Sequence, residues 1–233
     1  MVKIYILSFF SVLMLFINQA FAEIDDSVIC LDAAARLEKE FNIPPYILTA
    51  IALTETGKKK DIEGQDFFTP TPWAINIEGK GYYFSSKADA MIKVKKALAL
   101  GKKSIDVGCM QINLKYHGDA FASLEDAFNP YLNMRYAAEF VISLYERKKD
   151  WKKAVGHYHS GTPSLGVPYS DKVESNWERA ASLLHPHNAL FSYLNLQYKQ
   201  KRPKPPSKQE LYYRDRMKKI AQLRAEIRQN IIE

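Results

Sequence analysis

Glu55 is the only charged side chain on an otherwise apolar helical face, and this placement suggests chemistry. The helix is predicted over residues 46–56, and its apolar face continues with Leu48, Ile51 and Ala52. Burial and the negative end of the helix dipole both disfavour the ionised carboxylate, so both raise its pKa. A carboxyl group with a raised pKa can act as the general acid in glycoside cleavage. The alternative is a structural glutamate paired with a lysine at positions 58–60.

The histidines are the other candidates for chemistry, because they form two close pairs, His157 with His159 and His185 with His187. Residues i and i+2 of a helix point in different directions, so the first pair is a poor chelate. No carboxylate or cysteine completes either pair at ligand spacing. We therefore expect neither a metal ion nor a cofactor.

The elements that must position Glu55 are predicted to be mostly helical. A segment rich in aromatic and β-branched residues, 72–84, favours a small β hairpin with its turn at residues 78–81. Apolar periodicity, caps and helix-ending glycines predict further helices over residues 31–41, 86–100, 130–147, 151–158 and 171–184. The expected fold is a compact, mostly α body with short connections.

The N-terminus is predicted to be a secretory signal peptide over residues 1–22. It has a lysine at position 3, an apolar run over residues 4–17, and the cleavage pattern AFA over residues 20–22. The alternative is an uncleaved membrane anchor, for which the apolar run is short. We expect an exported protein in the periplasm, without a stable membrane anchor.

Export also changes what the two cysteines of the chain indicate. In an oxidising compartment, Cys30 and Cys109 form a natural disulfide pair. Two buried free thiols are the alternative.

The positive charge of the chain is concentrated at its C-terminal end. The formal net charge is +7, but from residue 198 onward there are eleven lysines and arginines against four acidic residues, which leaves residues 23–197 close to neutral. An exported protein rarely meets nucleic acid, so we expect no nucleic-acid partner. A protein or an anionic envelope surface fits the basic end better.

This C-terminal end divides into a linker over residues 186–206, basic and proline-rich at its end, and a helix over residues 207–233. Ser207 and Glu210 form a capping-box pattern, and apolar residues then recur at spacings of three and four. The helix either folds back on the body, docks a partner or another copy, or stays solvated.

Four sequence elements, taken in order, resemble those of lysozyme-like lytic transglycosylases. Residues 55–57 (ETG) resemble the family's Glu-Ser-Gly element, and residues 108–113 (GCMQIN) resemble its G-x-M-Q-I-N loop. Residues 154–161 (AVGHYHSG) are similar to its Ala-Tyr-Asn-Ala-Gly element, and residues 72–76 (PWAIN) with 116–117 (YH) resemble an exported subgroup with paired cysteines. The resemblance covers about residues 28–180.

The resemblance implies a lysozyme-like α+β domain over residues 23–185, with a small β element and a C-terminal helical tail. It implies cleavage of the β-1,4 bond between N-acetylmuramic acid (MurNAc) and N-acetylglucosamine (GlcNAc) in peptidoglycan glycan strands, leaving 1,6-anhydro-MurNAc ends. Glu55 would serve as acid and then as base, so no second carboxylate is needed. We expect Asp106, near the 108–113 loop, to cap that loop.

The same resemblance implies substrate contacts near Glu55. The sequence departs from the family pattern at Thr56, where serine is usual, and at His159, where asparagine is common. Core packing is the alternative for the aromatic and methionine side chains, and turn bonding is the alternative for Asn76. The predicted substrate-binding residues are Gln111, Tyr158, Met110, Asn113, Trp73, Asn76 and His159.

Two other functions remain open from the sequence. One is a lysozyme-type muramidase that hydrolyses the same bond with water, and the other is a non-catalytic peptidoglycan-binding module. The basic tail would suit docking to an envelope-spanning protein assembly.

Overall fold

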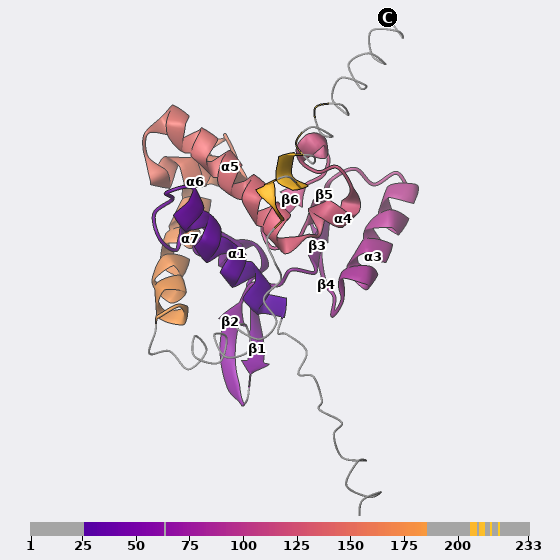
Figure 1. The fold of residues 1–233 in the computed structure, drawn as a ribbon, viewed down its shortest axis with the longest axis horizontal. Helices are drawn as coiled ribbons and strands as arrows, with labels where there is room; N and C mark the ends of the chain where they lie inside the picture. The colour runs from indigo at the N-terminus through magenta and orange to yellow at the C-terminus, as the bar shows by residue number, and fades with distance from the viewer. Residues whose placement is uncertain are drawn as a thin grey trace, which may run out of the picture.

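The computed structural model describes residues 26–185 except residue 63, together with residues 206–208, 210–212, 215 and 219. Two lobes make up the described body (Figure 1). The first consists mainly of helices α1 (Asp26–Glu40), α2 (Ile47–Thr56), α5 (Pro130–Lys148), α6 (Trp151–His159) and α7 (Pro163–Leu183). The second contains a small sheet with α3 (Lys87–Ala99), the short 3-10 helix η1 (Gly118–Ala120) and α4 (Leu124–Ala127).

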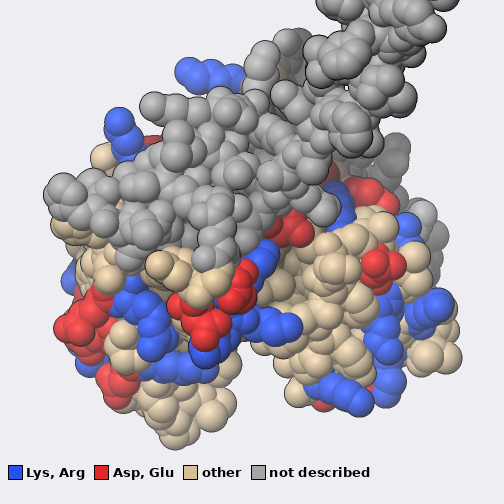
Figure 2. Space-filling model, turned by 90° about the horizontal axis from the view of Figure 1, so that it is seen from below, with Lys and Arg blue, Asp and Glu red and all other residues tan. Residues whose placement is uncertain are grey.

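The sheet of the second lobe is antiparallel, with strand order β4-β3-β5-β6. Its strands are β3 (Ala74–Ile77), β4 (Lys80–Tyr83), β5 (Ile105–Val107) and β6 (Ile112–Asn113). A separate hairpin of β1 (Lys58–Ile62) and β2 (Gln65–Thr69) follows directly after α2. Seen from below, the two lobes are separated by a notch, and acidic and basic side chains intermingle around it (Figure 2).

Each lobe has its own apolar cluster. The larger one joins α1, α2 and α5–α7, and the smaller one joins the sheet to α3. Helix α2 lies at the centre of the larger cluster, because eight of its ten residues are buried and it packs against α1, α5 and α7. Its N-terminus is capped from α1, where the Glu38 carboxylate accepts bonds from the backbone N–H groups of Tyr46, Leu48 and Thr49.

The mostly α prediction with a small β element is confirmed, and several boundaries follow local signals. Ser86 caps α3 through the N–H of Asp89, Asn129 caps α5, and the β3–β4 hairpin turns at residues 78–79. The capping box of the tail also forms, since Glu210 N–H donates to Ser207 Oγ at 3.1 Å and Ser207 N–H donates to Glu210 Oε2 at 3.3 Å.

Three expectations about the elements need correction. Helix α1 starts at Asp26 rather than at residue 31, and α7 starts at Pro163 rather than at 171. The β1–β2 hairpin was not predicted at all. The signal peptide over residues 1–22 lies outside the described residues, as do nearly all of the linker over 186–206 and most of the tail.

A disulfide joins the two lobes. Cys30 on α1 is bonded to Cys109 in the turn between β5 and β6, with Cα atoms 5.9 Å apart and both residues fully buried. The predicted pairing is therefore confirmed, and the described residues contain no free thiol.

Replacing both cysteines by serine is expected to lower the free energy of unfolding by up to about 4 kcal/mol, because the crosslink closes a loop of 79 residues in the unfolded chain. Urea unfolding followed by circular dichroism measures this loss, and the reduced wild-type protein serves as a matched control. An unchanged unfolding midpoint in both samples would contradict the prediction.

Candidate active site

Glu55 occupies the last turn of α2, where the two lobes meet. Its Oε1 accepts a hydrogen bond of 2.5 Å from the hydroxyl of Tyr169 on α7. No described ion pair links it to the lysines at positions 58–60, and Lys59 pairs with Asp66 across the β1–β2 hairpin. The interpretation of Glu55 as a lysine-paired helix end is therefore wrong.

The surroundings of Glu55 raise the pKa of its carboxyl group from 4.5 to about 7. Burial is the main cause, and the negative charge of Asp106 acts in the same direction. The hydrogen bond from Tyr169 and the positive charge of Lys172 lower the pKa and offset part of this effect. A carboxyl group with a pKa near 7 is well suited both to donate and to accept a proton at neutral pH.

The turn between β5 and β6, residues 108–111, is fixed against the end of α2. The Thr56 hydroxyl lies 3.1 Å from the Cys109 carbonyl oxygen, to which it donates. Gly108 has φ +80°, and a Cβ there would come within 2.6 Å of the Asn133 side chain. Asn133 in turn accepts from Met110 N–H at 2.9 Å and donates to the Val107 carbonyl at 2.9 Å. Thr56 thus retains the hydroxyl of the usual serine in a buried position.

Two of the three amide side chains predicted to bind sugar, Gln111 and Asn113, are hydrogen-bonded to the protein itself. Gln111 Nε2 donates to the carbonyl oxygens of Ala74 and Gly108 at 3.1 and 3.0 Å. Asn113 Nδ2 donates to Asp106 Oδ1 at 2.6 Å and to Ser104 Oγ at 3.1 Å. Both amide groups therefore hold the loop and the sheet together. They do so regardless of the atoms that they also offer to a ligand.

Three further side chains that were predicted to bind sugar make contacts within the protein. Met110 is fully buried in the larger apolar cluster. Trp73 is 8% exposed and its Nε1 donates to Asp26 at 2.6 Å. Asn76 Oδ1 accepts from Gly79 N–H at 2.8 Å, which is the turn bond of the β3–β4 hairpin. We therefore correct the assignment of Met110 and Trp73 to the sugar-binding surface, because core packing takes up both side chains.

Aromatic groups from α6 and α7 form the side of the site opposite the sheet. The Tyr158 hydroxyl donates to the Met110 carbonyl at 2.8 Å rather than to Glu55. The His159 ring stacks on the ring of Tyr169, with centroids 4.6 Å apart and planes inclined by 6°. The two helices can approach this closely because Gly156 and Gly166 face each other, and a Cβ on either would lie 2.9 Å from the other's carbonyl oxygen.

Tyr169 is the functional residue that the sequence analysis missed. The helix predicted over residues 171–184 began two residues after Tyr169, and Gly166 and Pro168 interrupt the helical pattern before that point. Pro163 was the available signal, since proline is favoured in the first turn of a helix, where its missing N–H costs nothing. Starting the helix there would have placed Tyr169 on the same face as Val173 and Asn176.

Comparisons with known proteins agree with this geometry. A family model described as Transglycosylase SLT domain matches residues 32–176. The matched span is more than half of the chain and includes Glu55, the 108–113 loop and Tyr169. Neither the comparison with curated proteins nor that with solved structures found a match.

Replacing Tyr169 by phenylalanine is expected to raise the pKa of Glu55 above 7, because the hydroxyl hydrogen bond favours the ionised carboxylate. Carbon-13 NMR titration of the glutamate carboxyl groups measures the shift. Tyr158→Phe is the matched control, since it removes a hydroxyl that bonds Met110 and leaves the Glu55 bond in place. Equal titration curves for wild type and Tyr169→Phe would refute the assigned role.

Proposed function

This chain belongs to the transglycosylase SLT family, and on that premise we propose that it cleaves the MurNAc-β-1,4-GlcNAc bond of peptidoglycan and leaves 1,6-anhydro-MurNAc ends. Members of the family are lytic transglycosylases of the lysozyme-like superfamily. The observation that carries the proposal is the partly buried carboxyl group of Glu55, held by Tyr169 at the junction of the lobes with a pKa raised to about 7.

In the proposed mechanism Glu55 acts twice. The protonated carboxyl group first donates its proton to the glycosidic oxygen, so that the bond between that oxygen and MurNAc C1 breaks. The resulting carboxylate then takes the proton of the MurNAc C6 hydroxyl as its oxygen bonds to C1, which restores the protonated acid. Since the acid form starts the cycle, turnover falls as the pH rises through about 7.

This mechanism differs from that of a lysozyme-type muramidase in its nucleophile. If water attacks C1 instead of the C6 hydroxyl, the products are reducing ends that carry one more water. A non-catalytic binding module would release no product of either kind. The mass of the released muropeptides therefore separates the three functions.

Glu55→Gln is expected to lower turnover of isolated sacculi by about 10³-fold, because the amide cannot donate a proton as an acid. The fold should remain intact, since glutamine still offers an oxygen to the Tyr169 hydroxyl. Glu125→Gln, an exposed glutamate on α4, is the matched control and should digest sacculi like wild type. Mass spectrometry of the wild-type products should show anhydro ends.

Two results would count against this assignment. Digestion by Glu55→Gln at the wild-type rate would remove Glu55 from the mechanism altogether. Reducing ends in the wild-type products, with Glu55→Gln inactive, would establish the muramidase instead.

The family's peptidoglycan substrate lies outside the cytoplasm, which supports our proposal of export to the periplasm by residues 1–22. Within the described residues, every helix is too short or too polar to cross a bilayer. The predicted signal peptide itself lies outside these residues and stays a prediction.

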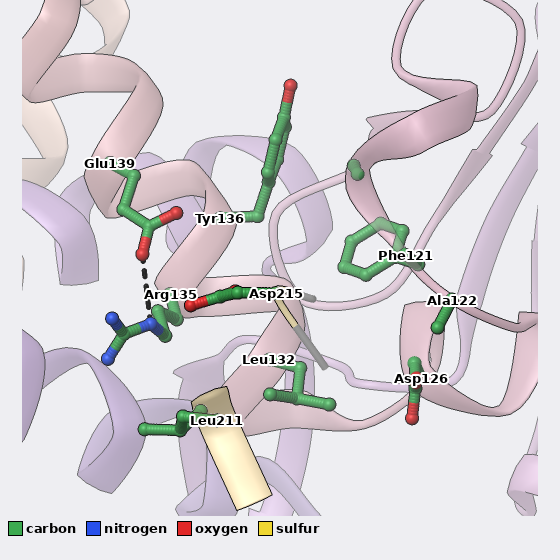
Figure 3. Close-up of a pocket in the computed structure, with 10 residues that line it drawn as sticks. Phe121, Ala122, Asp126, Leu132, Arg135, Tyr136, Glu139, Leu211 and Asp215 are labelled. Carbon is green, nitrogen blue, oxygen red and sulfur yellow. Dashed lines mark ion pairs between the residues drawn. The ribbon is translucent and has the colours of Figure 1, made fainter. Parts of the chain in front are cut away.

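The tail is the remaining part of the proposal, and we assign it a docking role for an envelope-spanning assembly. Its first turns lie against α5, because Leu211 and Asp215 line one pocket together with Leu132, Arg135 and Tyr136 (Figure 3). This contact supports the folded-back arrangement at Leu211 and Asp215. The apolar seam beyond residue 219 lies outside the described residues, and its basic surroundings in the sequence are what favour a partner.

Deleting residues 199–233 is expected to leave the rate of sacculus digestion within about twofold of wild type, because these residues lie outside the matched span 32–176 that contains Glu55. The same deletion should reduce recovery of the protein with the cell envelope, measured by fractionation. A shorter deletion of residues 220–233 keeps the contact with α5 and should have the same effect on recovery. The docking role would be contradicted if the 199–233 deletion variant does not fold. It would also be contradicted if both deletion variants are recovered with the envelope like wild type.

A further inference from the structure

His159 is the last residue of α6, and its ring is stacked on the ring of Tyr169 from α7. The two ring centroids are 4.6 Å apart, and the planes are inclined by 6°. Such a stack resists tilting and sliding of either ring, because both movements separate the two faces. His159 is exposed, whereas Tyr169 is only 9% exposed. The histidine ring therefore lies between the tyrosine ring and solvent.

The backbones of the two helices bring these rings together. Gly156 and Gly166 face each other so closely that a Cβ on either would lie 2.9 Å from the other's carbonyl oxygen. His159 follows Gly156 by three residues, which places both on the same side of α6. Tyr169 follows Gly166 by three residues and lies on the corresponding side of α7. The close backbone contact thus sets the distance between the two rings.

The orientation of the Tyr169 ring decides where its hydroxyl points. The ring belongs to the larger apolar cluster, and its hydroxyl makes one hydrogen bond among the described residues, the bond of 2.5 Å to Glu55 Oε1. Apolar neighbours fill the space around a ring but give its hydroxyl no direction. The hydroxyl therefore meets the carboxyl group only while the ring is held at the right angle.

The stack is also the main contact of His159 itself. Its ring nitrogens have no hydrogen-bond partner among the described residues, whereas Nδ1 of His157 lies 3.0 Å from the Lys153 carbonyl oxygen. Asparagine is common in the family at position 159 and has no ring that could cover the tyrosine. The histidine of this chain thus adds a contact that an asparagine would not supply.

Building on the function proposed above, we propose that His159 is a positioning residue of the transglycosylase reaction. Its ring holds Tyr169 in the orientation in which the tyrosine hydroxyl donates to Glu55. His159 acts through Tyr169, so this role requires no contact between His159 and the glycan.

Several titratable groups face Glu55 besides Tyr169. On the described elements packed against it, they are Asp106 of β5, Tyr158 of α6 and Lys172 of α7. Burial raises the pKa of Glu55 most and Asp106 adds to this, while the Tyr169 bond and Lys172 lower it. Tyr158 remains neutral near pH 7, because burial raises the pKa of its hydroxyl well above the usual range. Losing the Tyr169 bond therefore raises the pKa of Glu55 further.

Asp106 also interacts electrostatically with His159, and this effect must be separated from the stack. Burial raises the pKa of Asp106, while the Asn113 bond and the charge of His159 lower it. Asp106 Oδ1 accepts from Asn113 Nδ2 at 2.6 Å and no described backbone N–H donates to the carboxylate, so the expected loop-capping role is wrong. His159→Ala and His159→Phe both remove the imidazole charge, but only phenylalanine keeps a flat ring. The difference between these two variants therefore reports the stack alone.

The experiment compares the pKa of Glu55 in these two variants by carbon-13 NMR titration of the purified chain without substrate. We expect the pKa in His159→Ala to exceed that in His159→Phe by about half a pH unit, a roughly threefold smaller acid dissociation constant. The decline of sacculus digestion at high pH should move to higher pH by the same amount. His157→Ala is the matched control and should titrate like wild type, since that side chain bonds the backbone of its own helix.

A double-mutant cycle tests whether the effect passes through Tyr169. In the Tyr169→Phe background the hydroxyl is absent, so His159→Ala and His159→Phe should give the same Glu55 pKa. A merely structural role of the ring would lower the unfolding temperature of His159→Ala and leave the Glu55 pKa at its value in His159→Phe.

Equal Glu55 pKa values in His159→Ala and His159→Phe overturn the proposal. A difference that persists at full size in the Tyr169→Phe background overturns it too, because His159 would then act on Glu55 directly. If circular dichroism shows that His159→Ala does not fold, His159→Asn takes its place under the same criteria.

The inference and the proposed function fail in different experiments. Anhydro products from the wild type, together with equal Glu55 pKa values in the two variants, would remove the role of His159 and leave the function standing. Reducing-end products would remove the transglycosylase assignment, and the titrations, which use no substrate, would still decide whether His159 positions Tyr169.

Discussion

Keeping the Glu55 carboxyl group away from water is the constraint on which the rest of the site depends. A carboxyl group whose pKa rises from 4.5 to about 7 is less stable when ionised in the fold than in the unfolded chain. At about 1.4 kcal/mol per pKa unit, the cost is on the order of 3 kcal/mol above neutral pH. Its sign means that stability decreases as the pH rises from 4.5 to 7. The buried helix α2 and the disulfide provide the stability that offsets this cost.

The loop over residues 108–113 is held in the site by hydrogen bonds to its backbone atoms. Thr56, Tyr158 and Asn133 all bond to main-chain atoms of residues 107–110. A close approach of this kind requires a glycine at position 108, where a Cβ would collide with Asn133. The residues that make the loop recognisable in the sequence thus serve mainly to hold it in place.

Local signals in the sequence predicted the structural features that depend on residues close together along the chain. The periodicity around Glu55 and the cap at Ser86 are of this kind, because helix faces and caps involve residues within one or two turns. The β1–β2 hairpin escaped prediction because its three lysines break the alternation of apolar residues, and cross-strand pairing forms it instead. Tyr169 could not be matched to Glu55 from the sequence, because 114 residues separate the partners of that bond.

Segments from different parts of the chain assemble the surroundings of Glu55 and Asp106. The disulfide closes a loop that contains both Glu55 on α2 and Asp106 on β5, and it joins α1 to the turn that follows β5. His159 and Tyr169 lie outside that loop, on the α6–α7 pair that packs against α2. Each of the stacked rings acts on a different carboxyl group, Tyr169 by a hydrogen bond to Glu55 and His159 by its charge on Asp106. Burial raises the pKa of both carboxyl groups, and this helix pair supplies groups that lower it again, so the site is complete only when the two lobes and this pair have come together.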